Sequence, residues 1–562
     1  MRAARTGQVR ARLTTWALLR HLADEHAARP ALRFPDQGVE WTYADLAREA
    51  RALARGLLAA GVAPDDPVGL LVGNRPEWVA AWLATGLVGA VAVPVNTMAS
   101  GDEIDWILRH ADVSTLLLQP ALASHRYLDD LLVRHPELAS AEPGGIRCDG
   151  LPELRRAACL GLDAPRGGVV PWEDLVRSGA DVSDERLDAV GAEVDSDDDA
   201  LIIYTSGTTD RPKGIVHVQK TPWIQSTRFA SLMGLTCDDR VFTSQPFFWT
   251  AGIAMSLGAT LVAGARLVLQ ETFEPGRALE LIERERITTV HAWPHQEKAL
   301  GEHPDAARRD LRSVTKTRWS SPLAKLAGLE ADRWGVDASY GLSETFTIVS
   351  ALPADMPAEV RAKSSGKPLP GIELRIVDPL TGAPCATGEP GEIAVRGTTL
   401  MRGYHKVPRE NAFDADGWFR TQDGGSLDAD GHLHWTGRLS NLVKTGGANV
   451  SPLEIEGALR AYPGLRAALA VGVPHPTLGE ALVLCAIADP AARPAPDGEA
   501  IRAFLRERLA AYKVPRRVLF FAPDEIAYTG NQKIQVGELR TTALARLAAE
   551  GAEILGHRYA DA

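Results

Sequence analysis

Cysteine is scarce in this chain. Five of its 562 residues are cysteines, and they stand at Cys148, Cys159, Cys237, Cys385 and Cys485. The number is odd, and no two of them form a C-x-x-C pair, so the pattern argues against a disulfide framework. It predicts a reducing, cytoplasmic setting in which each thiol is an ordinary core or surface residue.

An excess of basic residues is also missing. The formal net charge is −11, from 61 lysines and arginines against 72 aspartates and glutamates. Proteins that bind nucleic acid usually carry a basic face, so we expect no nucleic-acid partner. The apolar share of 45% and the charged share of 24% are typical of a soluble globular protein and exclude a disordered chain.

Hydrophobic runs long enough to cross a membrane need a separate test. Two uncharged runs, residues 78–95 and 246–265, approach the length of a membrane span. Glycines interrupt both runs, and Pro94 interrupts the first. We therefore predict that each run is a buried helix followed by a buried strand, and we expect no membrane span.

Helical and strand patterns alternate over most of the first 340 residues. The alternation runs from residue 41 to 119 and resumes at residue 201. It predicts an α/β fold in which helices cover both faces of parallel sheets. Residues 135–195 are rich in proline, glycine and charge, and we expect loop and peripheral helix there.

The pattern of predicted helices and strands changes twice in the second half of the sequence. From residue 372, short alternating strands between glycine and aspartate turns predict a small antiparallel sheet or β-barrel. From residue 452, helix and strand patterns are mixed again. This part predicts a compact α+β domain that is joined to the rest of the chain near residue 438.

One segment carries the strongest chemical signal. Directly after the apolar strand 201–204 come several small and hydroxyl residues and a lysine, namely Thr205, Ser206, Gly207, Thr208, Thr209 and Lys213. Backbone N–H groups, hydroxyls and a lysine together suit a polyphosphate. The segment is not the P-loop of ordinary NTPases, because Pro212 and Gly214 occupy positions where that motif requires other residues. The alternative is a flexible surface loop.

This segment resembles the phosphate loop of the adenylate-forming superfamily, which comprises acyl-CoA synthetases, peptide-synthetase adenylation domains and luciferases. The resemblance continues in the family's order through residues 320–323, 340–345, 388–392, 402–404, 417–423, 437–438, 444–447, 452–456 and 533. It covers nearly the whole chain and is closest in pattern to acyl-CoA ligases. It implies a large N-terminal domain over residues 1–438, a hinge at 439–441 and a small mobile domain at 442–562.

The resemblance implies a role for each nucleotide-binding residue. Tyr340 would stack on adenine, beside Gly341 and the small-residue turn of Ser320, Ser321 and Pro322. Ser343 would bind a phosphate, and Glu344 would hold Mg²⁺ as an oxygen ligand. Asp423 would bind the ribose hydroxyls, and Arg438 would help to hold the nucleotide. In isolation, Glu344 and Asp423 would be read as solvated loop carboxylates.

Lys533 is the residue that the resemblance assigns to the reacting centre. In the family this lysine bridges the substrate carboxylate and the α-phosphate, and a cation placed between two anions lowers the barrier. Here Gln532 replaces the glycine that usually precedes it. The alternative is an ordinary exposed lysine.

Other departures from the family pattern lie near the hinge. Ser440 stands where the family usually has aspartate or lysine, Asn441 replaces a later aspartate, and Gln422 replaces a glycine. These changes concern how the small domain rotates. Lys444, Gly446 and Gly447 retain the pattern of the loop that lines the pantetheine channel in members that use coenzyme A.

The acid-binding pocket is the least determined part of the site. The resemblance places Phe248, Trp249, His291, Trp293 and Gly341 around it. Trp249 stands where many relatives carry histidine, and its bulk favours a compact acid, of which an aromatic acid is one example. Trp249 is either a fixed wall or a gate that swings aside, and Trp293 has simple core packing as its alternative.

Together these features predict an enzyme that activates a small-molecule carboxylic acid with ATP and Mg²⁺. The acyl-adenylate would then pass its acyl group to the thiol of coenzyme A. One alternative acceptor is a carrier protein, which we expect to be a separate chain; another is an amine or other nucleophile. A non-catalytic nucleotide-binding homologue is the alternative from a different class. The oligomeric state is not predicted.

Overall fold

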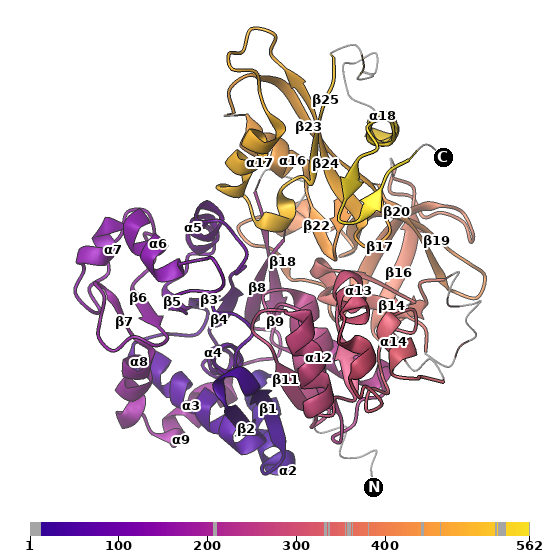
Figure 1. Ribbon diagram of the computed structural model, residues 1–562. Helices are drawn as coiled ribbons and strands as arrows, with labels where there is room; N and C mark the ends of the chain where they lie inside the picture. The colour runs from indigo at the N-terminus through magenta and orange to yellow at the C-terminus, as the bar shows by residue number, and fades with distance from the viewer. Residues whose placement is uncertain are drawn as a thin grey trace.

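The computed structural model places two units of unequal size, with the smaller one seated on the larger (Figure 1). It describes residues 13–560 except 206–210, 331–333, 335, 337, 354–355, 357–360, 362–363, 380, 440–442, 461, 523–524 and 526–535. We refer to residues 13–439 as the N-terminal unit and to residues 443–560 as the C-terminal unit.

An eight-stranded sheet forms one half of the N-terminal unit, in the order β18-β9-β8-β4-β3-β5-β6-β7. Its strands are β3 (Pro67–Leu71), β4 (Val91–Pro94), β5 (Thr115–Leu118), β6 (Arg156–Cys159), β7 (Val169–Pro171), β8 (Asp199–Thr205), β9 (Lys213–Val218) and β18 (Gly403–Tyr404). The strands from β8 to β7 run parallel, whereas β9 is antiparallel to both of its neighbours.

The helices of this half are α3 (Tyr43–Ala59), α4 (Pro76–Leu87), α5 (Gly101–His110), α6 (Tyr127–Arg134), α7 (Pro136–Ser140), α8 (Trp172–Ser178) and α9 (Asp184–Glu193). The predicted alternation of helices and parallel strands is confirmed. The prediction of loop and helix alone for residues 135–195 was wrong, because β6 and β7 extend the sheet there. Both strands are short, and the charge and proline around them masked their apolar pattern.

A second sheet has the order β12-β10-β11-β1-β2. Its strands are β1 (Pro30–Phe34), β2 (Val39–Thr42), β10 (Arg240–Thr243), β11 (Arg266–Leu269) and β12 (Thr289–His291). The helices that accompany it are α2 (Thr15–His26), α10 (Lys220–Leu232), the π-helix η3 (Gly252–Gly258), α11 (Ala259–Val262), α12 (Pro275–Arg284), α13 (Pro294–Glu302) and α14 (Pro322–Leu326).

The main hydrophobic core lies between these two sheets and is rich in tryptophan. Trp82 of α4 stacks on Trp223 of α10 with ring centroids 4.8 Å apart, and Trp78 contacts Phe247 at 5.2 Å. Helix α4 is buried on all sides, which explains its uncharged sequence. The first uncharged run is therefore a helix followed by β4, as predicted. The second contains η3 and α11, and its strand, β11, begins one residue after the run ends.

An antiparallel region completes the N-terminal unit. Strands β13 (Ser339–Leu342), β14 (Thr347–Ala351) and β15 (Lys367–Pro368) form one sheet, and β16 (Ile372–Val377), β17 (Gly391–Gly397), β19 (Phe419–Leu427) and β20 (Leu433–Arg438) form another. Hydrogen bonds from the Ser365 N–H to the Leu433 carbonyl and from the Leu433 N–H to the Gly366 carbonyl join the two sheets. The predicted small antiparallel region is confirmed.

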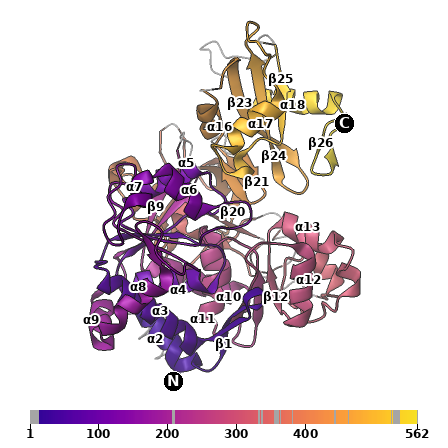
Figure 2. The same ribbon diagram turned by 60° about the vertical axis from the view of Figure 1, so that its left-hand side comes forward.

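The C-terminal unit is a sheet with helices on both faces (Figure 2). Strands β21 (Val443–Thr445), β22 (Ala448–Val450), β23 (Leu465–His475), β24 (Gly479–Ala488) and β25 (Arg517–Phe520) share one sheet. Helices α16 (Pro452–Leu459) and α17 (Gly498–Arg506) cover one face, and α18 (Val536–Ala549) packs against the core of the other. A small hairpin, β26 (Glu553–Ile554) and β27 (His557–Arg558), follows α18.

Two expectations about the whole chain can be checked here. Within the described part of the chain, every helix falls short of the length and apolar character needed to cross a membrane. All five cysteines are free thiols, and three of them are buried. The absence of a disulfide framework is therefore confirmed.

Candidate active site

The phosphate loop begins and ends at adjacent points on the large sheet. Thr205 ends β8, and Lys213 begins β9 directly opposite it in the antiparallel pair. The two ends of the predicted phosphate loop therefore lie side by side where β8 ends. The predicted phosphate-binding residues Ser206, Gly207, Thr208 and Thr209 lie outside the described residues, so only the two anchors of the loop are located.

Tyr404 links this loop to the predicted metal ligand. Its hydroxyl donates a hydrogen bond to Oε1 of Glu344 over 2.8 Å, and Lys213 Nζ lies 5.2 Å from the centre of its ring. Strand β18 brings Tyr404 here by pairing with β9. One side chain therefore orients the carboxylate and also contacts the cation, a role that sequence reasoning did not assign to it.

His217 supports the turn that carries Ser343 and Glu344. Its ring is fully buried, and Nε2 lies 2.8 Å from the Ser343 carbonyl oxygen. Burial lowers the pKa of His217 to about 3, so the ring is neutral at pH 7 and its Nε2–H donates to that carbonyl. The short 3₁₀ turn η5 (Ser343–Thr345) is thereby fixed to β9.

Tyr340 and Asp423 meet as two buried side chains of the antiparallel region. The Tyr340 hydroxyl donates to Asp423 Oδ2 over 2.8 Å. Gly341 follows, and a Cβ at that position would lie 1.9 Å from the Thr347 carbonyl oxygen, so only glycine fits. Arg438 is the cross-strand partner of Asp423, but its side chain lies outside the described residues. The structure therefore brings two of the predicted nucleotide residues into direct contact.

The predicted adenine turn lies at the start of α14. Ser321 is the N-cap of this helix, and its side chain accepts a hydrogen bond from the Leu323 N–H over 3.1 Å. Ser320 and Pro322 are exposed. Serine at 321 and proline at 322 are therefore explained by the start of the helix alone. The predicted position of the turn beside adenine stays a prediction.

Aromatic rings from both units gather at the predicted acid pocket. Trp249 contacts Phe248, Trp293 and Tyr512, with ring centroids at 5.0, 6.5 and 5.8 Å, respectively. Phe248 is buried and Trp249 is half-buried. Tyr512 belongs to the C-terminal unit and was missed by sequence reasoning, because nothing in its local sequence indicates a partner 263 positions away.

His291 occupies a buried polar network. Its Nδ1 lies 2.9 Å from the Ser256 hydroxyl, and its Nε2 lies 3.3 Å from the Gln245 amide nitrogen. Burial lowers its pKa to about 3, so it is neutral. The ring also contacts Trp334 at 5.2 Å. These contacts account for a buried histidine without a ligand, and its role in the acid pocket stays a prediction.

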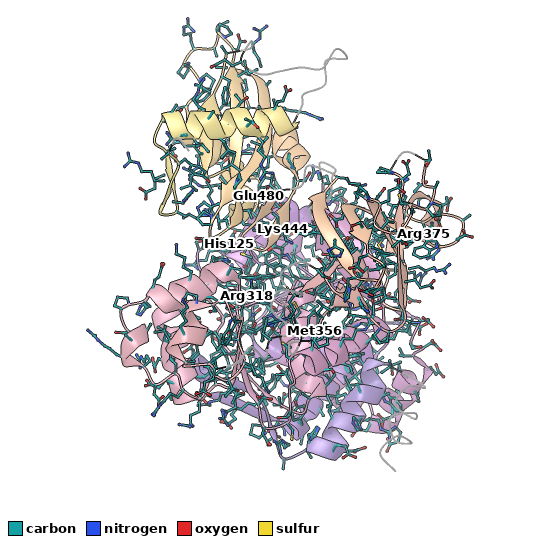
Figure 3. The ribbon with its side chains drawn as sticks, turned by 90° about the vertical axis from the view of Figure 1, so that its right-hand side faces the viewer. His125, Arg318, Met356, Arg375, Lys444 and Glu480 are labelled. Atoms are coloured by element: carbon teal, nitrogen blue, oxygen red, sulfur yellow. The ribbon has the colours of Figure 1, made fainter. Side chains whose placement is uncertain are left out.

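The loop between β21 and β22 inserts between the two units. Gly446 and Gly447 both have positive φ angles, +57° and +85°, and a Cβ on Gly447 would lie 2.9 Å from the Trp293 ring. Lys444 Nζ lies 5.1 Å from the centre of the Trp435 ring, and its backbone N–H donates to Glu480 over 2.8 Å. Lys444 and Glu480 lie together at the junction of the units (Figure 3).

Two further predictions fall outside the described residues. Lys533 belongs to the segment 526–535, and the hinge residue Ser440 belongs to the segment 440–442. Their roles therefore stay predictions. The located residues nevertheless form two groups: Lys213, Tyr404 and Glu344 beside the phosphate-loop anchors, and the aromatic cluster with the inserted glycine loop.

Comparison with known proteins identifies this arrangement. A model of the AMP-binding enzyme family matches residues 19–405, and a model of the AMP-binding enzyme C-terminal domain matches residues 454–533. A feruloyl-CoA synthase from Streptomyces sp is 34% identical over 532 residues, covering 94% of this chain and 98% of the relative. An indoleacetate–CoA ligase from Aromatoleum aromaticum is 32% identical over 526 residues, covering 92% and 96%.

Solved structures agree with the relatives found by sequence. The amide bond synthetase McbA from Marinactinospora thermotolerans aligns with a TM-score of 0.73 and 29% identity, over 93% of this chain and 99% of its own. The anthranilate CoA ligase AuaEII, solved with anthranoyl-AMP, aligns with a TM-score of 0.64 and 26% identity, over 95% and 98%. The chain belongs to the AMP-binding enzyme family, the adenylate-forming superfamily that includes the acyl-CoA ligases.

Proposed function

We propose that this protein is an AMP-forming acid–CoA ligase that acts in two steps. A carboxylate oxygen of the acid attacks the α-phosphorus of ATP, and the bond to pyrophosphate breaks. The thiol of coenzyme A then attacks the acyl carbon, and AMP leaves. The observation that carries this proposal is the insertion of the Gly446–Gly447 loop against Trp293, because it brings a side-chain-free stretch of backbone into contact with the aromatic cluster.

The first step depends on the arrangement around Tyr404. Lys213 anchors the phosphate loop, and Glu344 is half-buried with one oxygen bound to Tyr404, which leaves the other for a ligand. Nucleotide-bound Mg²⁺ is usually held by one or two carboxylates and by phosphate oxygens, so this donor set fits the ion. Mg²⁺ bound there would offset phosphate charge, and Lys533 would bring the acid carboxylate to the α-phosphate.

The acid that we propose is compact and aromatic. Trp249 is held between Trp293 and Tyr512, so the cluster offers flat apolar faces rather than a long straight tunnel. Three of the similar proteins support this choice, because the ferulate, indoleacetate and anthranilate in their names are all aromatic acids. A protein in a reducing cytoplasm has both ATP and coenzyme A available, which suits the proposed setting.

An amine is the second candidate acceptor. The likeness to an amide bond synthetase, at a TM-score of 0.73 over 93% of the chain, supports it. A separate carrier protein is a third acceptor with the same thiol chemistry as coenzyme A. Incubation of the enzyme with ATP, acid and each acceptor, followed by mass spectrometry, distinguishes a thioester from an amide.

The test of the function is pyrophosphate–ATP exchange without coenzyme A, with ferulate, indole-3-acetate and anthranilate as acids. We expect acid-dependent exchange, and we expect Lys533→Ala to reduce it by roughly a hundredfold or more, because a transition-state charge contact is lost. Lys298→Ala serves as the control lysine, since its side chain is 43% exposed. Exchange near the wild-type rate in a folded Lys533→Ala variant would refute the assigned role.

Tyr404→Phe tests the link between Glu344 and the phosphate loop. The variant keeps the ring beside Lys213 but loses the 2.8 Å hydrogen bond to Glu344. A net hydrogen bond contributes about 0.5–1.5 kcal/mol, so we expect Mg·ATP to bind roughly 2- to 13-fold more weakly. Titration calorimetry measures this, with Tyr462→Phe in the C-terminal unit as control. Unchanged affinity for Mg·ATP would mean that Tyr404 does not orient a nucleotide ligand.

Gly447→Trp should separate the two steps. A side chain here collides with the Trp293 ring, so the thiol path closes while the phosphate-loop region is untouched. We expect adenylate to form and thioester formation to be lost. Gly431→Trp is the matched control, because its φ of +79° is similar to the +85° of Gly447 and no atom lies within 4 Å of its Cβ. An equal loss of both steps in a folded Gly447→Trp variant would argue against a role in the thiol step alone.

Trp249→Ala tests the size of the acid pocket. If Trp249 is a wall, the wild-type enzyme should turn over acids of about twelve carbons poorly, and the variant should accept them better, because pocket volume is gained. A chain-length series with hexanoate, octanoate and dodecanoate measures this. Trp319→Ala is the control, since this tryptophan is 43% exposed. Efficient turnover of dodecanoate by the wild-type enzyme would contradict the wall and support a gate.

A further inference from the structure

A buried charge cluster crosses the boundary between the two units. Lys513 ends the 3₁₀ turn η7 (Ala511–Lys513) of the C-terminal unit, and its Nζ lies 2.7 Å from Glu103 Oε1 and 2.7 Å from Glu454 Oε1. Glu103 comes from α5 of the N-terminal unit and Glu454 from α16 of the C-terminal unit. The three side chains are only 2%, 8% and 3% exposed, respectively.

The cluster has one more acid than base. With all three groups charged, one negative charge would remain buried, which is costly. Glu454 Oε2 is buried and lacks a hydrogen-bond partner among the described residues. Burial raises the pKa of Glu454 to about 7 from its ordinary value, although Lys513 acts in the opposite direction. A proton on the carboxylate pair therefore neutralises the cluster near neutral pH.

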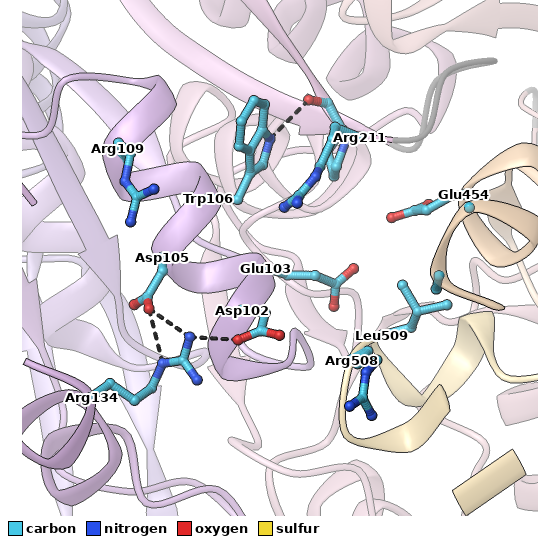
Figure 4. A pocket seen from close by; sticks show the side chains of 13 residues that line it. Asp102, Glu103, Asp105, Trp106, Arg109, Arg134, Arg211, Glu454, Arg508 and Leu509 are labelled. Atoms are coloured by element: carbon cyan, nitrogen blue, oxygen red, sulfur yellow. Dashed lines mark hydrogen bonds and ion pairs between the residues drawn. The ribbon is translucent and has the colours of Figure 1, made fainter. Parts of the chain in front are cut away.

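Solvent reaches the cluster through a cavity between the units. The cavity has a volume of about 530 Å³ and is lined by Glu103 and Glu454 together with Asp102, Asp105, Trp106, Arg109, Arg134, Arg211, Pro212, Gly457, Ala458, Arg508 and Leu509. Figure 4 shows the side chains of Glu103 and Glu454 projecting into this space from opposite sides. Of its other charged groups, Arg134 binds Asp102 and Asp105, Arg508 binds Glu507, Arg109 donates to the Gly150 carbonyl, and Arg211 lies over the Trp106 ring. Water in the cavity gives protons a route to the carboxylate pair.

Glu103 divides its two oxygens between two tasks. Oε2 accepts the Ser100 N–H over 3.0 Å and completes the capping box of α5, whereas Oε1 binds Lys513. The same turn of α5 holds the C-terminal unit directly, because the Ser100 hydroxyl donates to the Arg508 carbonyl over 2.8 Å. The position of Lys513 is therefore fixed by a rigid helix start.

Lys513 is adjacent in sequence to the residue that contacts the acid pocket. Tyr512 packs edge-on against Trp249 at 5.8 Å, and its hydroxyl lies 3.3 Å from Asn96 Nδ2. Burial raises the pKa of Tyr512 to about 12, so the phenol stays neutral. Seating Lys513 between the two carboxylates therefore also places an aromatic ring of the C-terminal unit on the pocket.

We propose that Lys513 is a positioning residue for the thiol-transfer step, and that docking of the C-terminal unit through Glu103 and Glu454 takes up one proton. The assignment of Lys513 to the thiol-transfer step rests on the proposed function, whereas the docking of the C-terminal unit through the charge cluster does not. The charge cluster holds the arrangement in which Gly447 lies on Trp293 and Tyr512 lies on Trp249.

The direction of the pH effect follows from the raised pKa of Glu454. In a separated C-terminal unit water reaches this carboxyl, so its pKa falls back toward the ordinary value of 4.5, whereas burial in the docked arrangement raises the pKa to about 7. Protonation therefore favours docking. The contribution is fully present below about 4.5 and is lost as the pH rises through about 7.

Energy transfer between two dyes measures docking without any substrate. One dye is attached at Val133→Cys on α6, where valine is 78% exposed, and the other at Glu499→Cys on α17, where the side chain is 70% exposed. Cys237 and Cys385, the two cysteines that are not buried, are replaced by serine. We expect the wild-type transfer efficiency to decline as the pH rises from about 4.5 through about 7, and to stay level above about pH 8.

Two variants should change the docking of the C-terminal unit at alkaline pH in opposite directions. Glu103→Gln keeps one acceptor oxygen for the helix cap and removes one negative charge, so the docked fraction should no longer depend on pH between 6 and 8.5. Lys513→Met leaves two facing carboxylates without a cation, so transfer should be low at pH 8 and recover only at acid pH. Lys298→Met is the control, because Lys298 also reaches across the boundary, to Thr477 at 3.4 Å, but is exposed. Circular dichroism confirms folding. A wild-type pH curve in Lys513→Met would overturn the proposal, as would a curve in Glu103→Gln that still declines near pH 7.

The two half-reactions provide the second measurement, with ferulate as the acid. In Lys513→Met we expect exchange within about threefold of wild type and thioester formation reduced by roughly tenfold or more, because only the docked fraction is competent. An equal loss in both steps would overturn the positioning role. If the wild-type enzyme shows no exchange with any acid, the proposed function fails, whereas the energy-transfer series still decides whether the charge cluster controls docking.

Discussion

Strand β9 is the constraint on which the nucleotide side of the molecule depends. It pairs with β8 on one edge and with β18 on the other, so it fixes Lys213 opposite Thr205 and places Tyr404 within reach. Near its C-terminal end, His217 fixes the Ser343 carbonyl and with it the turn that presents Glu344. The antiparallel direction of β9 matters, because it brings the end of the phosphate loop back to its beginning at the edge of an otherwise parallel sheet.

The predicted acid pocket depends instead on the boundary between the two units. Phe248, Trp249 and Trp293 belong to the larger unit, but Tyr512 and the glycine loop complete their surroundings from the smaller one. In the proposed function, the specificity for the acid and the access of the acceptor would therefore both depend on the docked arrangement, which we propose is controlled by the buried charges around Lys513.

The sequence predicted the α/β fold, the antiparallel region and the position of the C-terminal unit, because these depend on local periodicity and on ordered motifs. It also predicted that Tyr340, Asp423, Trp249, Trp293 and Gly447 belong to one region, and the structure brings them into contact in pairs. It did not reveal the contacts of Tyr404, Tyr512, Lys513 and Glu103. Lys513 and Glu103 are 410 positions apart, and each reads locally as an ordinary surface charge, so only the tertiary structure brings them together.

The double use of Glu103 has a consequence for how such proteins can be recombined. One of its oxygens shapes the beginning of a helix, and the other receives the lysine of the neighbouring unit. A C-terminal unit grafted from a relative would therefore dock on the first turn of α5. The backbone geometry of that turn depends on the same carboxylate that binds the lysine. A graft that also carries the first turn of α5 from the same relative keeps the two contact surfaces together. The segment to be exchanged therefore includes this short turn as well as the C-terminal unit, although the two are far apart in the sequence.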